Sequence, residues 1–343
     1  MPKMNGNRVT LKEVANECGY TANTVSRALR NDPHLSPDTR KKIRETAERL
    51  GYIPNKMASS LRSGKSHVVA VIVNDLHNQH FCQMLGKMDA ELQNAGYSLL
   101  ILCMQLNEEL AQQLINTAIS LSVDGILYFP HLRSQTTLDS MLNNHMPFVL
   151  LDRRVQDIST DCVRCDDEEG GYLAGKHLAK LGHRNYLYLS GLDISSSQID
   201  RMAGFRRAMS EYGIPEENIR IIPGETAEDA LSRGCIGELL TPFDYTAIVS
   251  FRDELAYPAV NALRMQGISV PGDVSVISFD NLSGGNPNLQ QMTSVYAAES
   301  DVASEGVKVL LERIEKPELP IQTKILPVRI FNEYATAGPV KFK

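Results

Sequence analysis

The first fifty positions carry hydrophobic residues at helical spacing. The first repeat falls at i, i+3, i+4 and i+7, on Leu11, Val14, Ala15 and Cys18. Thr10 and Glu13 form a capping box at the start of this helix, and Gly19 ends it. A second short helix is expected from Thr21, as its cap, to about Arg30. A third is expected to follow Ser36, its cap, and to end at Gly51. Three short helices with a tight turn between the first two predict a helix-turn-helix bundle.

The second of these helices has two chemically different sides. Its apolar side carries Val25, Ala28 and Leu29. Its other side is expected to carry Asn23, Ser26, Arg27 and Arg30. Asn pairs bidentately with adenine and Arg with guanine in the major groove of DNA. A polar helix face is usually only solvated, but the caps, the turn and the charge together favour a face that reads DNA.

Beyond residue 66, short apolar runs alternate with amphipathic stretches in two series. The first series of strands is expected near His67–Asn74, Ser98–Met104, Gly125–Phe129 and Phe148–Leu151. The second is expected near Tyr186–Ser190, Ile219–Ile222, Ala247–Phe251 and Val274–Phe279. Such alternation predicts parallel sheets covered by helices on both faces, and two series predict two Rossmann-like lobes. No apolar run reaches the length of a membrane span.

Charge is distributed unevenly along the chain. Residues 1–66 carry 13 Lys or Arg and 6 Asp or Glu, whereas the other 277 residues carry 22 and 35. A basic head can bind a polyanion through release of counterions, and an acidic body cannot. We therefore expect a DNA-binding domain at 8–53, a connecting segment at 54–66, and a larger domain at 67–343.

Polar side chains stand at the ends of the expected strands in the larger domain. They are Asp75, the pair Asp152 and Arg153, the pair Arg252 and Asp253, and Asp280. Arg201 is expected to open a helix of the second lobe. Singly, each residue would be read as a helix cap or a surface ion pair. Because ligands bind parallel sheets at the carboxyl ends of their strands, the shared location predicts a ligand cleft.

Motifs of metal, cofactor or catalytic sites are missing from the sequence. Cys162 and Cys165 have the spacing of a metal or redox pair, but no second pair follows, and the segment reads as a strand that points the two thiols to opposite faces. A glycine-rich phosphate loop and a nucleophile elbow are also absent. We therefore expect no metal, no cofactor and no enzymatic activity.

The head motifs are specific enough to indicate a family. They are the run Val9–Ala15, Gly19, Thr24–Arg27, Ser36–Arg40, Leu50–Tyr52 and Pro54–Asn55. This pattern resembles that of the lactose-repressor (LacI/GalR) family, and the resemblance covers essentially the whole chain. It implies an all-α helix-turn-helix head with a hinge helix, followed by a two-lobed α/β domain like a periplasmic sugar-binding protein.

The resemblance also implies which residues contact DNA. Ala22, Asn23 and Arg27 match the positions that read the major groove. Leu61, in the hinge helix Asn55–Leu61, matches a leucine that wedges between base pairs of the minor groove, and Ala58 would lie where two hinge helices touch. The full expected DNA-binding set is Thr10, Leu11, Thr21, Ala22, Asn23, Thr24, Ser26, Arg27, Asn55, Ala58, Leu61 and Arg62.

For the larger domain, the resemblance implies a small effector bound between the lobes. The residues that match the effector-binding pattern are Asp75, Phe81, Asp152, Arg201, Asp253 and Asp280. Arg252 departs from the family, which usually has a small residue or a neutral amide there. Together with Arg153 and Arg201, it could attract a carboxylate or phosphate. Alternatively, Asp152, Asp253 and Asp280 simply neutralise these arginines, so a neutral sugar, a sugar phosphate and a sugar acid all stay open.

These inferences add up to a cytoplasmic transcriptional repressor of carbohydrate genes, acting as a homodimer on a pseudopalindromic operator. Three other functions compete with it. A periplasmic binding protein is disfavoured by the basic head and by the lack of a signal sequence, and an enzyme by the absence of catalytic motifs. A DNA-binding protein without an effector is the third, and a thermal-shift screen of sugars would distinguish it from a sensor.

Overall fold

The computed structural model describes residues 9–53, 64–131, 134–192, 195–298 and 301–340. The chain divides into two compact units, Met1–Ser66 and His67–Lys343. The predicted hinge residues Asn55, Ala58, Leu61 and Arg62 lie outside the described residues.

Residues 9–53 of the first unit form three helices, α1 (Leu11–Cys18), α2 (Ala22–Leu29) and α3 (Pro37–Leu50). Their buried apolar residues form one small core, made of Val14, Ala15, Cys18, Val25, Ala28, Ile43 and Ala47. Gly19 ends α1 with a φ of 77°, a backbone conformation that costs glycine far less than any residue with a Cβ. The turn that the sequence predicted between the first two helices is therefore built on this glycine.

The second unit contains two six-stranded sheets, each in its own lobe. In the first lobe the strand order is β11-β5-β4-β3-β1-β2, and all neighbours are parallel. These strands are β1 (Val68–Val73), β2 (Ser98–Cys103), β3 (Gly125–Tyr128), β4 (Phe148–Leu151), β5 (Cys162–Cys165) and β11 (Thr323–Leu326). In the second lobe the order is β12-β10-β9-β8-β6-β7, in which only β12 runs antiparallel to its neighbour. These strands are β6 (Tyr186–Leu189), β7 (Ile219–Ile222), β8 (Ala247–Ser250), β9 (Ser275–Phe279), β10 (Ser294–Ala297) and β12 (Val328–Phe331).

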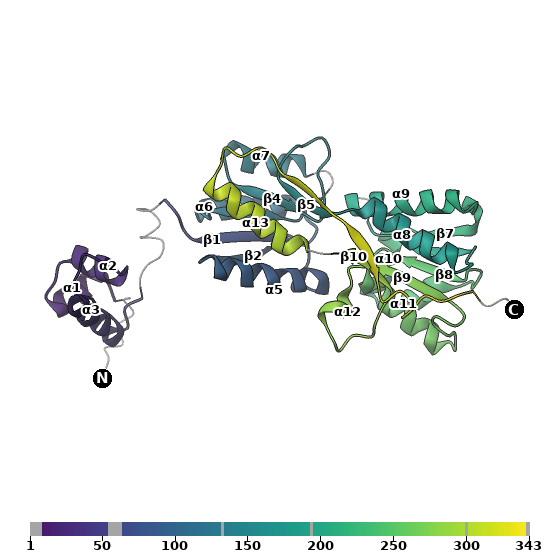
Figure 1. Ribbon diagram of the computed structural model, residues 1–343, viewed down its shortest axis with the longest axis horizontal. Coiled ribbons are helices and arrows are strands. Elements are labelled where there is room, and N and C mark those ends of the chain that lie inside the picture. Colours follow the sequence, from purple (N-terminus) through teal and green to yellow (C-terminus); the bar gives the residue numbers. More distant parts are fainter. Residues whose placement is uncertain (1–8, 54–63, 132–133, 193–194, 299–300, 341–343) are drawn as a thin grey trace. The chain divides into compact units, whose positions relative to one another are not determined.

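Helices cover both faces of each sheet, as Figure 1 shows. In the first lobe, α5 (Gln79–Asn94) and α13 (Val302–Glu315) pack on one face, and α6 (Glu108–Ser120) and α7 (Gln135–Asn143) on the other. In the second lobe, α8 (Asp167–Lys180) and α9 (Ser196–Glu211) cover one face, while α10 (Gly224–Ser232) and α11 (Asp253–Met265) cover the other. The short α12 (Leu282–Gly285) follows β9, and the one-turn helices η1 (Glu216–Asn218) and η2 (Ile236–Leu240) complete this lobe. The central strands are therefore buried on both sides, which explains why β1 reads as the uninterrupted apolar run VVAVIV.

The two sheets repeat one topology, which locates the expected ligand site. Leaving out the last strands, both follow the order 2-1-3-4-5, so the strand order reverses between β1 and β3 in the first lobe and between β6 and β8 in the second. Ligands bind such sheets outside the carboxyl ends of the strands at this reversal. The chain passes between the lobes three times, after β5, β10 and β11, so each lobe contains segments that are distant in sequence.

Two glycines allow α8 and α9 to pack backbone against backbone. A Cβ on Gly204 would lie 1.8 Å from the Glu168 carbonyl oxygen, and one on Gly171 would lie 1.9 Å from the Arg201 carbonyl oxygen. Only glycine permits such a close approach. It places Arg201 of α9 directly over the N-terminal turn of α8. None of the helices among the described residues is long and apolar enough to cross a membrane.

Candidate functional site

The start of α2 presents a polar surface on the first unit. Thr21 caps this helix by accepting a hydrogen bond from the Thr24 amide at 3.2 Å, and the two hydroxyls lie 2.9 Å apart. The Thr10 capping box of α1 is present as predicted: the Thr10 amide donates to Glu13 at 2.7 Å, and the Glu13 amide donates to the Thr10 hydroxyl. The caps therefore fix the residues at which α1 and α2 begin. A fixed start determines which side chains of each helix face solvent.

Ala22 and Asn23 are exposed on this surface, and Arg27 is partly exposed. The Arg27 Nε donates to Asp32 at 2.8 Å, and this hydrogen bond lowers the pKa of Asp32. This pair uses the Arg27 Nε, and neither Nη group makes a hydrogen bond within the described residues, so both can donate to a base edge. Leu11 is half-buried against the core of this unit.

Ser26 corrects the sequence analysis. We expected it on the outward face of α2, but its exposed fraction is only 8%. Position 26 lies directly after buried Val25, and on a helix with two buried neighbours at 25 and 28 the apolar stripe is wide enough to cover it.

In the second unit, Arg201 is the centre of a buried ion cluster. Its Nε donates to Asp167 at 2.7 Å, its Nη1 donates to the Phe251 carbonyl at 2.6 Å, and its Nη2 lies 3.7 Å from Asp280. The rings of Phe251 and Phe279 lie 4.9 and 4.3 Å from its guanidinium carbon. This cation therefore already has two carboxylate partners and an aromatic cage.

The position of Arg201 on its helix differs from our prediction. We expected it to open the helix, but α9 begins at Ser196, so Arg201 lies in its second turn and is buried. Three serines precede it at positions 195–197, and serine is a preferred residue at helix starts. The Ser197 hydroxyl reaches the first lobe and donates to the Asp152 carbonyl at 3.2 Å. The Ser195 hydroxyl is buried and has no hydrogen-bond partner among the described residues.

Asp152 is paired with His80, which the sequence analysis did not single out. Asp152 follows β4, and its Oδ2 lies 2.9 Å from the His80 Nε2 at the start of α5. Burial alone lowers the pKa of His80, but the carboxylates of Asp280 and Asp152 outweigh burial and raise it to about 9. His80 is therefore a cation at neutral pH. No motif marks it, because its partners are 72 and 200 positions away.

Asp152 and Asp280 share an unusual backbone. Their φ angles are 62° and 92°, in the left-handed region that residues with a Cβ rarely adopt. Such conformations persist only where the surrounding structure holds them in place, and they are concentrated at ligand sites. Both residues end central strands, β4 and β9, at the edge where the topology locates the cleft.

Arg153 differs from the other two arginines of the cleft. Burial lowers its pKa, and the positive charges of Arg201 and Arg252 lower it further against the effect of Asp152. Among the described residues it has no salt-bridge partner within 4 Å. Its donors are thus available to a ligand. Phe81, packed edge-on to Phe129 at 4.9 Å, adds an apolar surface next to His80.

Asp253 is placed differently from the other predicted effector residues. It is completely buried, and its two carboxylate oxygens accept from the Leu282 amide at 2.8 Å and the Ser294 hydroxyl at 2.9 Å. Burial raises its pKa to about 7, and Asp280 adds to this shift. Both its oxygens hold α12 and β10 in place, so the structure assigns it to the support of the cleft.

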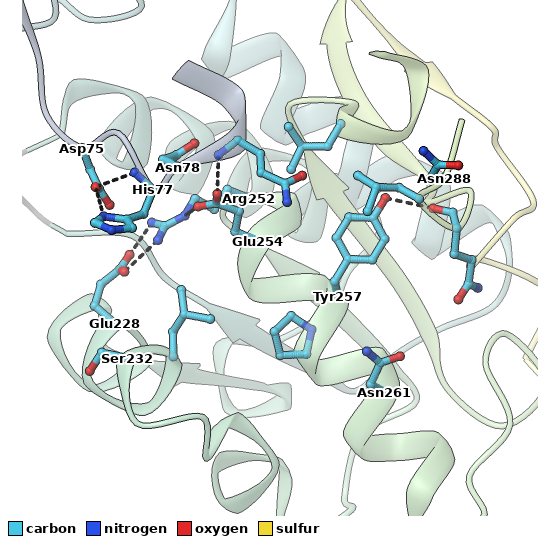
Figure 2. Close-up of a pocket in the computed structure, with 16 residues that line it drawn as sticks. Asp75, His77, Asn78, Glu228, Ser232, Arg252, Glu254, Tyr257, Asn261 and Asn288 are labelled. Atoms are coloured by element: carbon cyan, nitrogen blue, oxygen red, sulfur yellow. Dashed lines mark hydrogen bonds and ion pairs between the residues drawn. The ribbon is translucent and has the colours of Figure 1, made fainter. Parts of the chain in front are cut away.

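Asp75 and Arg252 line a cavity of about 740 Å³ between the lobes, shown in Figure 2. Asp75 accepts hydrogen bonds from the His77 amide and ring at 2.8 and 3.0 Å. Arg252 is bound on one side by Glu228 and on the other by Glu254. Neutralisation of the arginines by Asp152, Asp253 and Asp280 was one of the alternatives left open by the sequence. In the structure, Asp167 and Asp280 neutralise Arg201, and Glu228 and Glu254 neutralise Arg252.

Hydrogen bonds join the two lobes beside this cavity. The Gln79 amide at the start of α5 donates to Glu254 at 2.7 Å, and the Gln83 side chain donates to the Leu282 carbonyl at 3.1 Å. Farther along, the Arg154 amide donates to the Ser196 hydroxyl at 3.0 Å. A ligand that moved one lobe relative to the other would change these contacts. No group of His, Cys, Asp and Glu among the described residues is arranged to hold a metal ion.

Comparisons with known proteins support both halves of this arrangement. Residues 10–55 match the model of bacterial regulatory proteins of the lacI family, and residues 176–332 match that of a periplasmic binding protein-like domain. The chain is 28% identical to catabolite control protein A of Priestia megaterium, over 94% of this chain and 97% of that protein. Its fold is similar to that of the lac repressor dimer bound to operator, with a TM-score of 0.82, 22% identity, and coverage of 96% and 100%. A LacI family regulator from Enterococcus faecium with bound ribose is also similar, with a TM-score of 0.67, 26% identity, and coverage of 80% and 100%.

Proposed function

We propose that this chain is a member of the LacI family of bacterial regulatory proteins, and a repressor of carbohydrate genes that releases or binds its operator in response to a small sugar or sugar derivative. Members of this family are transcriptional regulators, not enzymes. The observation that carries the proposal is the capped two-helix unit with exposed Asn23 and Arg27 on a basic module. An operator as target also implies a cytoplasmic location.

The proposed DNA target is a pseudopalindrome, because a twofold dimer presents its two reading helices in opposite directions. The similar lac repressor structure is a dimer bound to operator, and we propose the same assembly here. Asn23 and Arg27 supply side chains that distinguish adenine and guanine, and exposed Ala22 supplies an apolar contact for a thymine methyl. Exposed Lys41 and Lys42 of α3 add positive charge for the phosphates.

The proposed effector site is the cleft between the lobes. Its support is the convergence of Asp152, Arg153 and Asp280 at the strand ends with Arg201 of α9. Ribose bound to the Enterococcus faecium relative makes a sugar the first ligand class to test. No cofactor is part of this proposal. Differential affinity of the ligand for two lobe arrangements would supply the regulation, and DNA would then change ligand affinity by the same factor.

A selection experiment tests the DNA half of the proposal. The intact protein is mixed with random duplex oligonucleotides at moderate salt, with and without a panel of sugars and sugar phosphates, and the bound fraction is sequenced. We expect enrichment of one inverted repeat and a change in its retention with at least one sugar. If no inverted repeat is enriched under any condition, the proposed function is wrong.

Arg27 provides a sharper test of direct base reading. Arg27→Ala is expected to reduce affinity for the selected site by about 1–3 kcal/mol, and to relax the base preference at one position of each half-site, because a bidentate contact to guanine is lost. Binding of single-base operator variants, measured by fluorescence anisotropy, checks this. Lys12→Ala, an exposed cation of α1, is the control and should weaken binding to all variants about equally. If Arg27→Ala also weakens binding to all operator variants equally, Arg27 contacts only phosphate and does not read a base.

A further inference from the structure

The cavity in Figure 2 has walls from both lobes. The first lobe contributes the segment from Asp75 to Gln79, and the second contributes α10, α11 and the residues Asn288–Gln290 that precede β10. One side is apolar and includes the Tyr257 ring. The Tyr257 hydroxyl donates a hydrogen bond to the Gln290 carbonyl at 2.8 Å. The rest is rich in amide and carboxylate groups. Such a mixture of a ring face and many hydrogen-bonding groups suits a compact hydroxylated ligand.

Arg252 would be expected to make this cavity an anion receptor, but its guanidinium is already occupied. Its Nη1 and Nη2 both bind the Glu228 carboxylate, the second at 2.8 Å, and its Nε donates to Glu254 at 3.2 Å. Figure 2 shows the guanidinium enclosed between these two acids. The bidentate edge, which arginine uses to recognise carboxylates and phosphates, therefore faces Glu228.

The charges of the lining residues point the same way. Asp75, Glu228 and Glu254 carry three negative charges, and Arg252 carries one positive charge. An entering phosphate or carboxylate would meet this negative excess. To reach Arg252 it would have to displace Glu228, whose side chain is only 25% exposed, and leave that carboxylate without its partner. Hydroxyl groups, in contrast, can donate to the carboxylates and accept from the amides of Asn261 and Asn288 without such displacement.

We propose that the cavity takes an uncharged hydroxylated ligand and excludes anions, and that Glu228 imposes this specificity by occupying the bidentate edge of Arg252. The inference rests on the proposed ligand-sensing function and assigns the charge class of the ligand. Glu228 acts as a specificity-determining residue, because without it the same arginine would recognise a phosphate or a carboxylate.

The test uses inorganic phosphate as the probe and the intact protein. Glu228→Gln removes one acceptor and the negative charge, so the Arg252 edge becomes available. We expect phosphate to bind this variant at least about tenfold more tightly than the wild type, the factor that one charge-assisted hydrogen bond supplies. Titration calorimetry measures the affinities. Glu225→Gln, an exposed position on the same helix, is the matched control and should behave like the wild type.

Two further variants keep the proposal falsifiable. The double variant Glu228→Gln with Arg252→Gln should lose the gained phosphate binding, and Glu228→Ala should reproduce the gain if the glutamine variant folds poorly, as judged by thermal unfolding. The proposal is overturned if the wild type binds phosphate as tightly as Glu228→Gln, or if the gain persists without Arg252. These outcomes do not depend on sugar-controlled DNA binding, so they are distinguishable from a failure of the proposed function.

Discussion

Replacement of Arg201 by alanine is expected to lower the free energy of unfolding of the unit 67–343 by about 3–5 kcal/mol, the range for removing one partner from a buried ion pair. Arg201 is 9% exposed, and without it the carboxylates of Asp167 and Asp280 would be left buried without their cation. The contacts of its guanidinium with the Phe251 and Phe279 rings would be lost as well. Urea unfolding of the intact protein, monitored by circular dichroism, measures the loss.

A second arginine on the same helix is the matched control. Arg207 pairs with Glu168 and Glu169, but its side chain is 47% exposed, so Arg207→Ala should cost no more than about 1 kcal/mol. Adding Asp167→Asn to Arg201→Ala should recover part of the loss, because one of the unpaired charges is then removed. Equal losses for the two arginine variants would mean that the cluster around Arg201 is as well solvated as a surface pair.

The stability of the wild type is expected to fall as the pH rises from 6.5 to 9, by up to about 3 kcal/mol, because His80 loses its charge beside the carboxylates of Asp280 and Asp152. The pKa of His80 is raised to about 9 in the folded protein, from an ordinary value of 6.5. The imidazolium therefore contributes its full stabilisation below pH 6.5, and the contribution is lost as the pH rises through the folded pKa. Its side chain is 10% exposed, so solvent screens the pair little.

His80→Gln identifies the source of this pH dependence. Glutamine keeps a donor near Asp152 but has no titrating group, so the variant should lack most of the slope between pH 6.5 and 9. Asp253, whose pKa is raised to about 7, titrates in both proteins. Subtracting the stability of the variant from that of the wild type at each pH therefore cancels its contribution. Unfolding curves at half-unit pH steps give both slopes. Parallel curves for wild type and variant would show that His80 does not carry the charge assigned to it.

Local signals explain which predictions were confirmed. The capping box of Thr10 and Glu13, the turn at Gly19 and the cap at Thr21 involve residues within four positions of one another, so their chemistry can be read directly from neighbouring residues. The strand runs of both lobes were predictable for the same reason, since burial on both faces produces an uninterrupted apolar segment. The resemblance to the LacI family followed from the head motifs, and residues 10–55 match the model of that family.

The predictions that failed depended on exact helix positions. We expected Arg201 to open its helix, but α9 begins five residues earlier, at Ser196, so Arg201 lies inside the helix and is buried. Ser26 was placed outward with the other polar residues of its helix, but its exposed fraction is only 8%. In both cases the packing of neighbouring elements outweighed the local preference of the residue.

By itself, the sequence determined the two-part organisation, the helix caps of the head, the alternation of strands and helices, and the strand ends where Asp75, Asp152 and Asp280 lie. Only the tertiary structure decided which charges meet: Asp167 with Arg201, His80 with Asp152, and Glu228 with Arg252. Periodicity reports which face of an element is buried, but it carries no information on which residue of a distant element lies opposite. These partners are 34, 72 and 24 positions apart. Each pair lies within one lobe, where the order of the strands and helices brings residues that are distant in sequence to the same edge of the sheet.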